Sequence, residues 1–278
     1  MNNIETSSGQ TQTLLKIRRA EALGKYSWDT TILDTTNYKY EINYGWGINQ
    51  WGESGSYEGA DLMRELNTDY LGNIIVGTDG KWFNGNNNMK TANMPTSIIN
   101  IESQSMIESV VWNLGSPNND NGTYVDIASD VFTTSYIYAH ERGNTTGKIC
   151  TSGASCNDTV IRTTSWIGKV GLFYPSDYFF ATSGGSTKNR QTCLNTKIFD
   201  WYNDDCSYNN WLFSYYIPTM SPYTHVNDAD KIFVVNEFGS IELFNAKNDL
   251  NINPVVFLKS SVSITGGTGT ESDPYTLG

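Results

Sequence analysis

From about residue 116 to the C-terminus, the sequence consists of short apolar runs separated by turn residues. Such runs, bounded by Gly, Pro, Asn, Asp or Ser, are typical of β-strands rather than helices. Residues 236–239, NEFG, separate two of the runs and favour a tight turn, which predicts a β-hairpin. The pattern predicts strands at residues 170–174, 177–182, 231–236, 240–244 and 254–264.

Helical periodicity is confined to the region before this pattern begins. Apolar residues at helical spacing predict helices over residues 10–24, 58–67 and 101–114. We therefore expect an α+β fold, with helices in the N-terminal part and antiparallel strands and long loops in the C-terminal part. The expected organisation is an N-terminal helical arm, residues 1–25, followed by a single globular α+β domain, residues 26–278.

The charge balance restricts the class of partner. The 278 residues carry 18 basic and 29 acidic side chains, a formal net charge of -11. This charge opposes the counterion release that drives nucleic-acid binding and repels an anionic membrane surface. No apolar run has the length of a membrane span, and the first thirty residues lack the apolar segment of a signal peptide, so the export route stays open.

Four cysteines fall into two local pairs, Cys150 with Cys156 and Cys193 with Cys206. Neither spacing matches the C-x-x-C pattern of zinc sites or of thioredoxin-like redox motifs. Four cysteines allow three pairings, and four free thiols remain the alternative. We expect two local disulfides, because the loops between the cysteines are rich in Gly, Ser, Asn and Asp. Disulfides indicate an oxidising, extracellular compartment.

The sequence contains little that predicts catalysis. Its two histidines, His140 and His225, have no G-x-S-x-G elbow beside them, and no phosphate-binding glycine loop is present. We assign no cofactor and no metal ligand, although the oxygen-rich residues 116–130 and 226–230 leave a calcium ion open. Paired carboxylates of a glycoside hydrolase also remain open. The acids considered for that role are Asp200, Asp204 and Asp205, or Glu58, Asp61 and Glu65.

The strongest functional signal is the aromatic, Asn-rich stretch 201–230. Recognition surfaces favour Tyr and Trp for their large contact area at low entropic cost, and Asn for adaptable hydrogen bonds. We expect a loop face here that binds a glycan or a host or bacterial surface protein. Its contact platforms and polar specifiers would be Trp201, Tyr202, Asn203, Tyr208, Asn209, Asn210, Tyr215, Tyr216, Tyr223 and Asp228.

Several segments resemble a widespread group of bacterial surface proteins, many of which begin with a prepilin-type helix. The most specific is GLFYPSDYFFATSGG, residues 171–185, and KYSWDT, ADLMRELNTDYLGN, NNWLF and the C-terminal PVVFLKSSVSITGGTGTESDPYTLG also match. The resemblance extends over most of the chain from residue 25 and implies an exposed, non-catalytic surface protein.

The C-terminal region also resembles C-type-lectin-like domains, including those of formylglycine-generating enzymes and of variable adhesins. A tryptophan-rich segment, a hairpin and a final strand occur in that order, with WIG at 166–168 and WYND at 201–204 as landmarks. Asn253 stands where the pattern has Arg, and the lectin calcium element is missing, so the calcium site is not carried over.

These observations favour a non-catalytic extracellular module, an adhesin or pilin-like protein of the cell surface that binds a ligand through its aromatic loop face. A structural filament subunit that self-assembles without a ligand is one alternative. A secreted carbohydrate-active enzyme with paired carboxylates is the other. Neither nucleic acid nor a membrane span is expected.

Overall fold

The structure is a computed structural model, and it describes most of the chain. The described residues are 3–29, 49–53, 59–68, 70–71, 81–83, 89–91, 101–120, 123–142, 163–201, 206–213, 215–225, 228, 230–270 and 272–278. Cys150 and Cys156 lie outside them, as do Tyr202 and Asn203.

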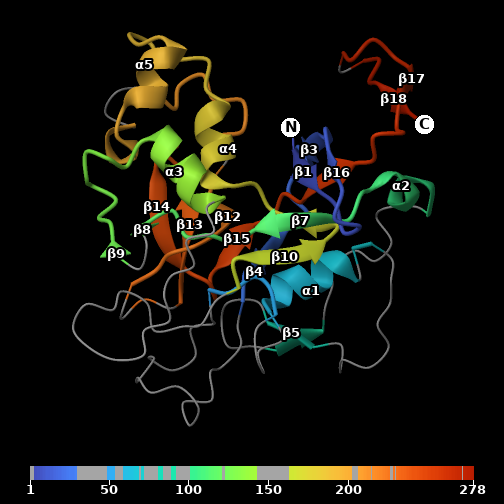
Figure 1. The fold of residues 1–278 in the computed structure, drawn as a ribbon, viewed down its shortest axis with the longest axis horizontal. Coiled ribbons are helices and arrows are strands. Elements are labelled where there is room, and N and C mark those ends of the chain that lie inside the picture. Colours follow the sequence, from blue (N-terminus) through green and yellow to red (C-terminus); the bar gives the residue numbers. More distant parts are fainter. Residues whose placement is uncertain are drawn as a thin grey trace.

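Helices and small antiparallel sheets alternate along the described chain, which agrees with the α+β class (Figure 1). The helices are α1 (Asp61–Asn67), α2 (Ile101–Met106), α3 (Thr134–Glu141), α4 (Pro175–Phe180) and α5 (Arg190–Asn195), with a 3-10 turn at Ile198–Asp200. The expectation of helices early and strands late is wrong, because α3, α4 and α5 follow strands that begin near the N-terminus.

The strands up to the middle of the chain are β1 (Ile4–Glu5), β2 (Thr11–Gln12), β3 (Leu15–Arg18), β4 (Lys25–Ser27), β5 (Lys81–Phe83), β6 (Met89–Thr91), β7 (Val110–Asn113), β8 (Asn119–Asp120) and β9 (Thr123–Tyr124). The later strands are β10 (Ser165–Gly168), β11 (Val170–Gly171), β12 (Ile217–Pro222), β13 (Lys231–Val235), β14 (Ile241–Asn245), β15 (Asp249–Asn251), β16 (Val255–Leu258), β17 (Ile264–Gly266) and β18 (Thr276–Leu277).

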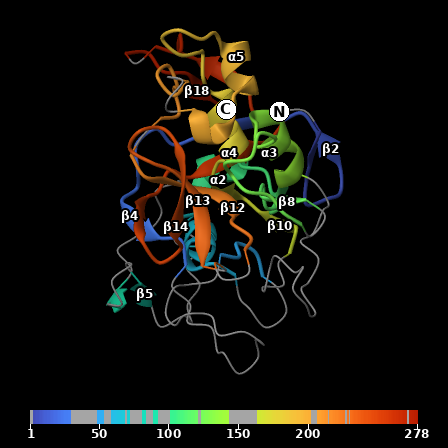
Figure 2. The same cartoon turned by 90° about the vertical axis from the view of Figure 1, so that its left-hand side faces the viewer.

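The predicted C-terminal hairpin is confirmed as β13 and β14, which pair from Lys231 with Asn245 to Val235 with Ile241. The Asn236 side chain accepts hydrogen bonds from the backbone N–H groups of Phe238 at 3.0 Å and Ser240 at 2.9 Å. Gly239 adopts φ +75°, a conformation that glycine reaches without strain. Strand β12 completes a three-stranded sheet, and α4 packs against it (Figure 2).

The helix expected over residues 10–24 is wrong. Residues Leu15–Arg18 form β3, which pairs antiparallel with the buried strand β16. The segment L-K-I-R alternates apolar and basic residues, which is the period of a strand. Pairing with a strand more than two hundred residues away overrides the local helical preference, so the N-terminal segment belongs to a sheet rather than to a helical arm.

Two other expectations need correction. The helix predicted for 101–114 stops at Met106, and the β-branched Val110 and Val111 enter β7, which pairs with β10. The strand predicted for 177–182 is instead the helix α4, because Pro175 occupies its first turn and Asp177 accepts a hydrogen bond from the Tyr174 N–H at 2.9 Å. By contrast, α1 forms within the predicted 58–67 region.

Four tryptophans anchor the core, Trp28, Trp51, Trp112 and Trp201, all at most 1% exposed. Trp28 and Trp51 contact each other with ring centroids 5.2 Å apart. The helices α3, α4 and α5 gather at one end of the molecule, and the C-terminal hairpin β17–β18 extends from the body on another side (Figure 1). This arrangement leaves β3 between the helical end and the hairpin.

Candidate functional site

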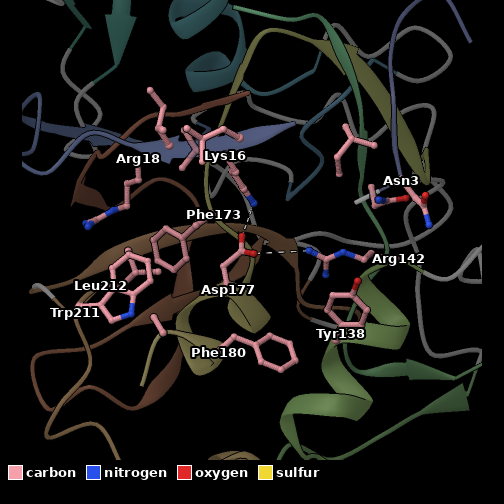
Figure 3. Close-up of a pocket in the computed structure, with 16 residues that line it drawn as sticks. Asn3, Lys16, Arg18, Tyr138, Arg142, Phe173, Asp177, Phe180, Trp211 and Leu212 are labelled. Carbon is pink, nitrogen blue, oxygen red and sulfur yellow. Dashed lines mark hydrogen bonds and ion pairs between the residues drawn. The ribbon is translucent and has the colours of Figure 1, made fainter. Parts of the chain in front are cut away.

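A groove with a volume of about 740 Å³ runs along β3, between that strand and the helices α3 and α4 (Figure 3). We call it the β3 groove. Its walls are mainly apolar, with a few charged groups on its floor, as in many ligand-binding sites. The apolar and aromatic lining consists of Ile4, Leu15, Ile17, Tyr138, Phe173, Phe180, Ala181, Trp211, Leu212 and Val255. The polar lining consists of Asn3, Lys16, Arg18, Asn113, Arg142 and Asp177.

Strand β3 is an edge strand of its sheet. The sheet order is β11-β16-β3, so within the described chain no strand pairs with the outer edge of β3. The Arg19 N–H donates to the Pro254 carbonyl at 2.9 Å, and in an antiparallel ladder alternate residues point to the same side. The backbone N–H and C=O groups of Leu15 and Ile17 therefore point to β16, and those of Lys16 and Arg18 point to the open edge.

An ion cluster forms the floor of the groove. The Lys16 ammonium is held by the Asp177 carboxylate and lies 4.4 Å from the centroid of the Tyr174 ring. Burial lowers the pKa of Lys16, and the neighbouring Asp177 carboxylate partly offsets this. Arg142 Nη2 lies 3.7 Å from Asp177 Oδ1, and the guanidinium stacks 4.1 Å from the Tyr138 centroid. The cluster fixes β3, α3 and α4 relative to one another.

Glu141 forms an ion pair with Arg142 and holds its guanidinium in place. Its carboxylate lies 3.0 Å from Arg142 Nη1 and accepts hydrogen bonds from the Ser176 hydroxyl and, at 3.0 Å, from the Ser176 N–H. The side chain is fully buried, and burial raises the pKa of Glu141 to about 7 despite the opposing effects of Arg142 and Ser176. This part of the floor is therefore sensitive to pH near neutrality.

Arg18 differs from its neighbours. Its Nε and Nη2 atoms are buried and have no hydrogen-bond partner. Burial lowers the pKa of Arg18 to about 10, with no contribution from a nearby carboxylate. The guanidinium carbon lies 5.7 Å from the centroid of the Phe173 ring. Figure 3 shows Arg18 on the same side of β3 as Phe173, whereas Lys16 points to Asp177.

The segment that follows the Cys193–Cys206 disulfide borders this groove through Trp211 and Leu212. Cys193 and Cys206 form the expected disulfide, 13 positions apart in sequence. After Cys206, the rings of Tyr208, Trp211 and Tyr215 are exposed, and Trp211 is also part of the groove wall. Asn209 is exposed as well. Tyr208, Asn209 and Tyr215 are the predicted contact residues that the structure places at the surface, and Trp211 is an exposed ring beyond that prediction.

Other residues predicted for that face lie in the interior. Trp201 is 0% exposed, and its indole N–H donates to the Cys193 carbonyl at 3.0 Å. Asn210 is buried and donates to the Tyr178 carbonyl at 2.7 Å, while Tyr223 is buried against Phe233. A contact role for these three side chains does not fit their burial. Each instead stabilises the loop from within.

The last two described members of the predicted face are partly buried. Tyr216 packs on Phe244 with ring centroids 5.2 Å apart. Asp228 forms ion pairs with Lys231 at 2.5 Å and with His225 at 3.0 Å, the latter when the histidine is protonated. These contacts tie the two residues to the β12–β14 region and away from the β3 groove.

Sequence reasoning missed Lys16, Arg18, Asp177 and Arg142. The alternation in L-K-I-R was the available signal, since a strand places both cations on one face. Nothing in the sequence indicated that α3 and α4 would bring Arg142 and Asp177 beside them.

Comparisons with known proteins found no matching family model, no matching curated protein and no matching solved structure. Among the described residues there is no group of His, Cys, Asp and Glu side chains arranged to hold a metal ion. In the same part of the chain, no helix combines the length and the apolar content needed to cross a bilayer.

Proposed function

We propose that the chain is a non-catalytic binding module that holds an extended segment of a partner protein in the β3 groove. The observation that carries this proposal is that all four residues of β3, an edge strand, line a groove with apolar walls. Exposed edge strands offer unpaired backbone groups that can pair with another chain. In such recognition, backbone hydrogen bonds provide affinity and the flanking pockets select side chains.

The exposed side chains of the groove support a protein partner. Leu15 is 60% exposed, Ile17 is 38% exposed and Trp211 is 75% exposed, all on the walls of one groove. Large exposed apolar groups that cluster around a hollow indicate an interaction site. An extended peptide fits this lining better than a glycan, because its apolar side chains bury against these walls while its backbone pairs with β3.

The charged residues of the floor support a binding role rather than catalysis. Lys16, Arg142 and Asp177 are engaged with one another, and Glu141 with Arg142 and Ser176. Groups held in this way stabilise the floor of a site. They are not poised as a nucleophile and its base, which would need a shared proton and an open approach.

We include an extracellular location in the proposal. The Cys193–Cys206 disulfide favours an oxidising compartment. The order of the disulfide segment, hairpin β13–β14 and strand β16 is in keeping with the C-type-lectin-like resemblance. The adhesin and pilin-like roles belong to the same proposal.

Selection of random linear peptides displayed on phage tests the function. We expect enriched peptides to bind the wild-type protein and to lose about tenfold or more in affinity with Trp211→Ala or Leu15→Ser, because exposed groove anchors of this kind dominate binding. Phe238→Ala is the matched control, since Phe238 is exposed and lies outside the groove lining.

The variant Tyr208→Ala distinguishes binding in the β3 groove from binding on the aromatic loop face. If Tyr208→Ala abolishes binding while Leu15→Ser does not, the partner binds the loop face and the groove proposal is wrong. Binding to a glycan array without enrichment of any peptide would also contradict it.

A further inference from the structure

We propose that Arg18 anchors a carboxylate of the bound segment, so that the module selects acidic extended peptides. This inference rests on the proposed function and specifies the chemistry of the partner. It follows from the charges around the β3 groove, the hydrogen bonds that Arg18 lacks and the position of its guanidinium.

Among the described residues that line the groove, Arg18 is a cation with no carboxylate beside it. Two cations, Lys16 and Arg142, face two carboxylates, Asp177 and Glu141, within one connected cluster. Among the described residues, Arg18 has neither an ion pair nor a hydrogen bond to its Nε and Nη2 atoms. Buried charges in proteins are normally paired, because an unpaired one loses its hydration without compensation. A ligand anion would supply the missing partner.

The two unpartnered atoms lie on one edge of the guanidinium. Nε–H and one N–H of Nη2 are parallel donors in a rigid planar fork, which matches both oxygens of a carboxylate. A lysine at this position would offer a point charge without that geometry. The vacant edge therefore favours a carboxylate held by two hydrogen bonds.

The side chain is free to present this edge to the groove. Nε and Nη2 are shielded from solvent, and no hydrogen bond holds them there. Rotation about the outer side-chain torsions breaks no hydrogen bond of either atom. Figure 3 shows the guanidinium on the side of β3 occupied by Phe173, Leu212 and Trp211. An acidic residue opposite Arg18 would thus lie beside an apolar residue packed on these side chains.

The backbone of Arg18 also faces the open edge of β3. A peptide strand that pairs with this edge passes directly beside the guanidinium, so its register determines which residue meets Arg18. The carboxylate has two sources in a peptide, an Asp or Glu side chain or the C-terminus, and the test distinguishes them.

The experiment uses peptides enriched on the wild-type protein. Each is synthesised in three forms: unchanged, with every Asp or Glu replaced singly by Asn or Gln, and with an amidated C-terminus. Calorimetry measures the Kd of each form for the wild-type protein, Arg18→Gln, Arg18→Lys and Arg19→Gln. Arg19→Gln is the matched control, because Arg19 is the next cation in sequence and does not line the β3 groove.

We expect one carboxylate whose removal weakens binding to the wild-type protein by about tenfold or more. The same removal should change binding to Arg18→Gln by less than about twofold, and Arg18→Lys should recover only part of the affinity. Arg19→Gln should behave as the wild type does.

Equal losses in the wild-type protein and Arg18→Gln would overturn the inference while leaving the proposed function intact. Neutral peptides that bind as tightly as acidic ones would do the same. Failure to enrich any peptide would remove the proposed function, and this inference with it.

Discussion

Arg18 and Lys16 lie two residues apart on one face of β3, yet we expect their removal to have opposite effects on stability. Lys16 is paired with Asp177, whereas Nε and Nη2 of Arg18 have no partner. Breaking a buried ion pair leaves an uncompensated charge, but removing an unpaired buried charge relieves a penalty. Arg18→Met and Lys16→Met therefore form a matched pair of variants with comparable apolar stems.

The magnitude follows from the pKa of Arg18. Burial lowers that pKa from 12.5 to about 10. At about 1.4 kcal/mol per unit, this sets an upper limit of about 3–4 kcal/mol on the cost of keeping Arg18 charged. Because part of the side chain reaches solvent, screening reduces the cost to about 1–2 kcal/mol. Arg18→Met should raise the free energy of unfolding by that amount, and Lys16→Met should lower it by about 3 kcal/mol.

Urea unfolding followed by tryptophan fluorescence at pH 7 measures both changes. The slopes of the unfolding transitions must agree among variants, so that a shifted midpoint reports stability. If Arg18→Met lowers the free energy of unfolding by more than about 1 kcal/mol, Arg18 has a structural partner and the reasoning fails. A neutral effect of Lys16→Met would show that its pairing with Asp177 contributes no more than an apolar side chain does.

Two further predictions concern stability. The raised pKa of Glu141, about 7 against an ordinary 4.5, means that the folded state binds this proton more tightly than the unfolded state. The protein should therefore lose about 3 kcal/mol of stability as the pH rises from about 4.5 to about 7, and Glu141→Gln should flatten that dependence in urea titrations at several pH values. If the stability of Glu141→Gln depends on pH as that of the wild-type protein does, a group other than Glu141 causes the dependence. The double variant Cys193→Ser, Cys206→Ser should lower the free energy of unfolding by about 3 kcal/mol, because it releases a short closed loop in the unfolded chain. Equal stability of the oxidised protein and this variant would contradict that expectation.

The parts of the fold that the sequence predicted are those fixed by local interactions. The β13–β14 hairpin follows from two apolar runs and from a turn in which the Asn236 side chain accepts a hydrogen bond from the Ser240 N–H. Helix α1 follows from Leu62, Met63 and Leu66, all buried on one face. The errors arise where distant pairing or capping decides the structure. Strand β3 needs β16, and α4 depends on Pro175 and Asp177 at its first turn.

The candidate site was predictable only in part. The disulfide and the exposed rings of Tyr208 and Tyr215 were predicted from composition and spacing, whereas the exposed Trp211 was not among the predicted residues. Trp201 and Tyr223 have the same residue types but are buried, because composition does not distinguish an interior ring from a surface ring. The β3 groove itself combines residues from β3, α3, α4 and the segment after Cys206, which only the folded chain brings together.

The central claim is that a partner segment pairs with the open edge of β3. Amide hydrogen exchange, followed by NMR with and without a saturating enriched peptide, tests it most directly. The account predicts that exchange slows by about tenfold or more at Lys16 and Arg18, whose N–H groups face that edge, and stays unchanged at Glu242 in β14. Protection confined to residues such as Tyr208 and Tyr215, with no change in β3, would contradict it.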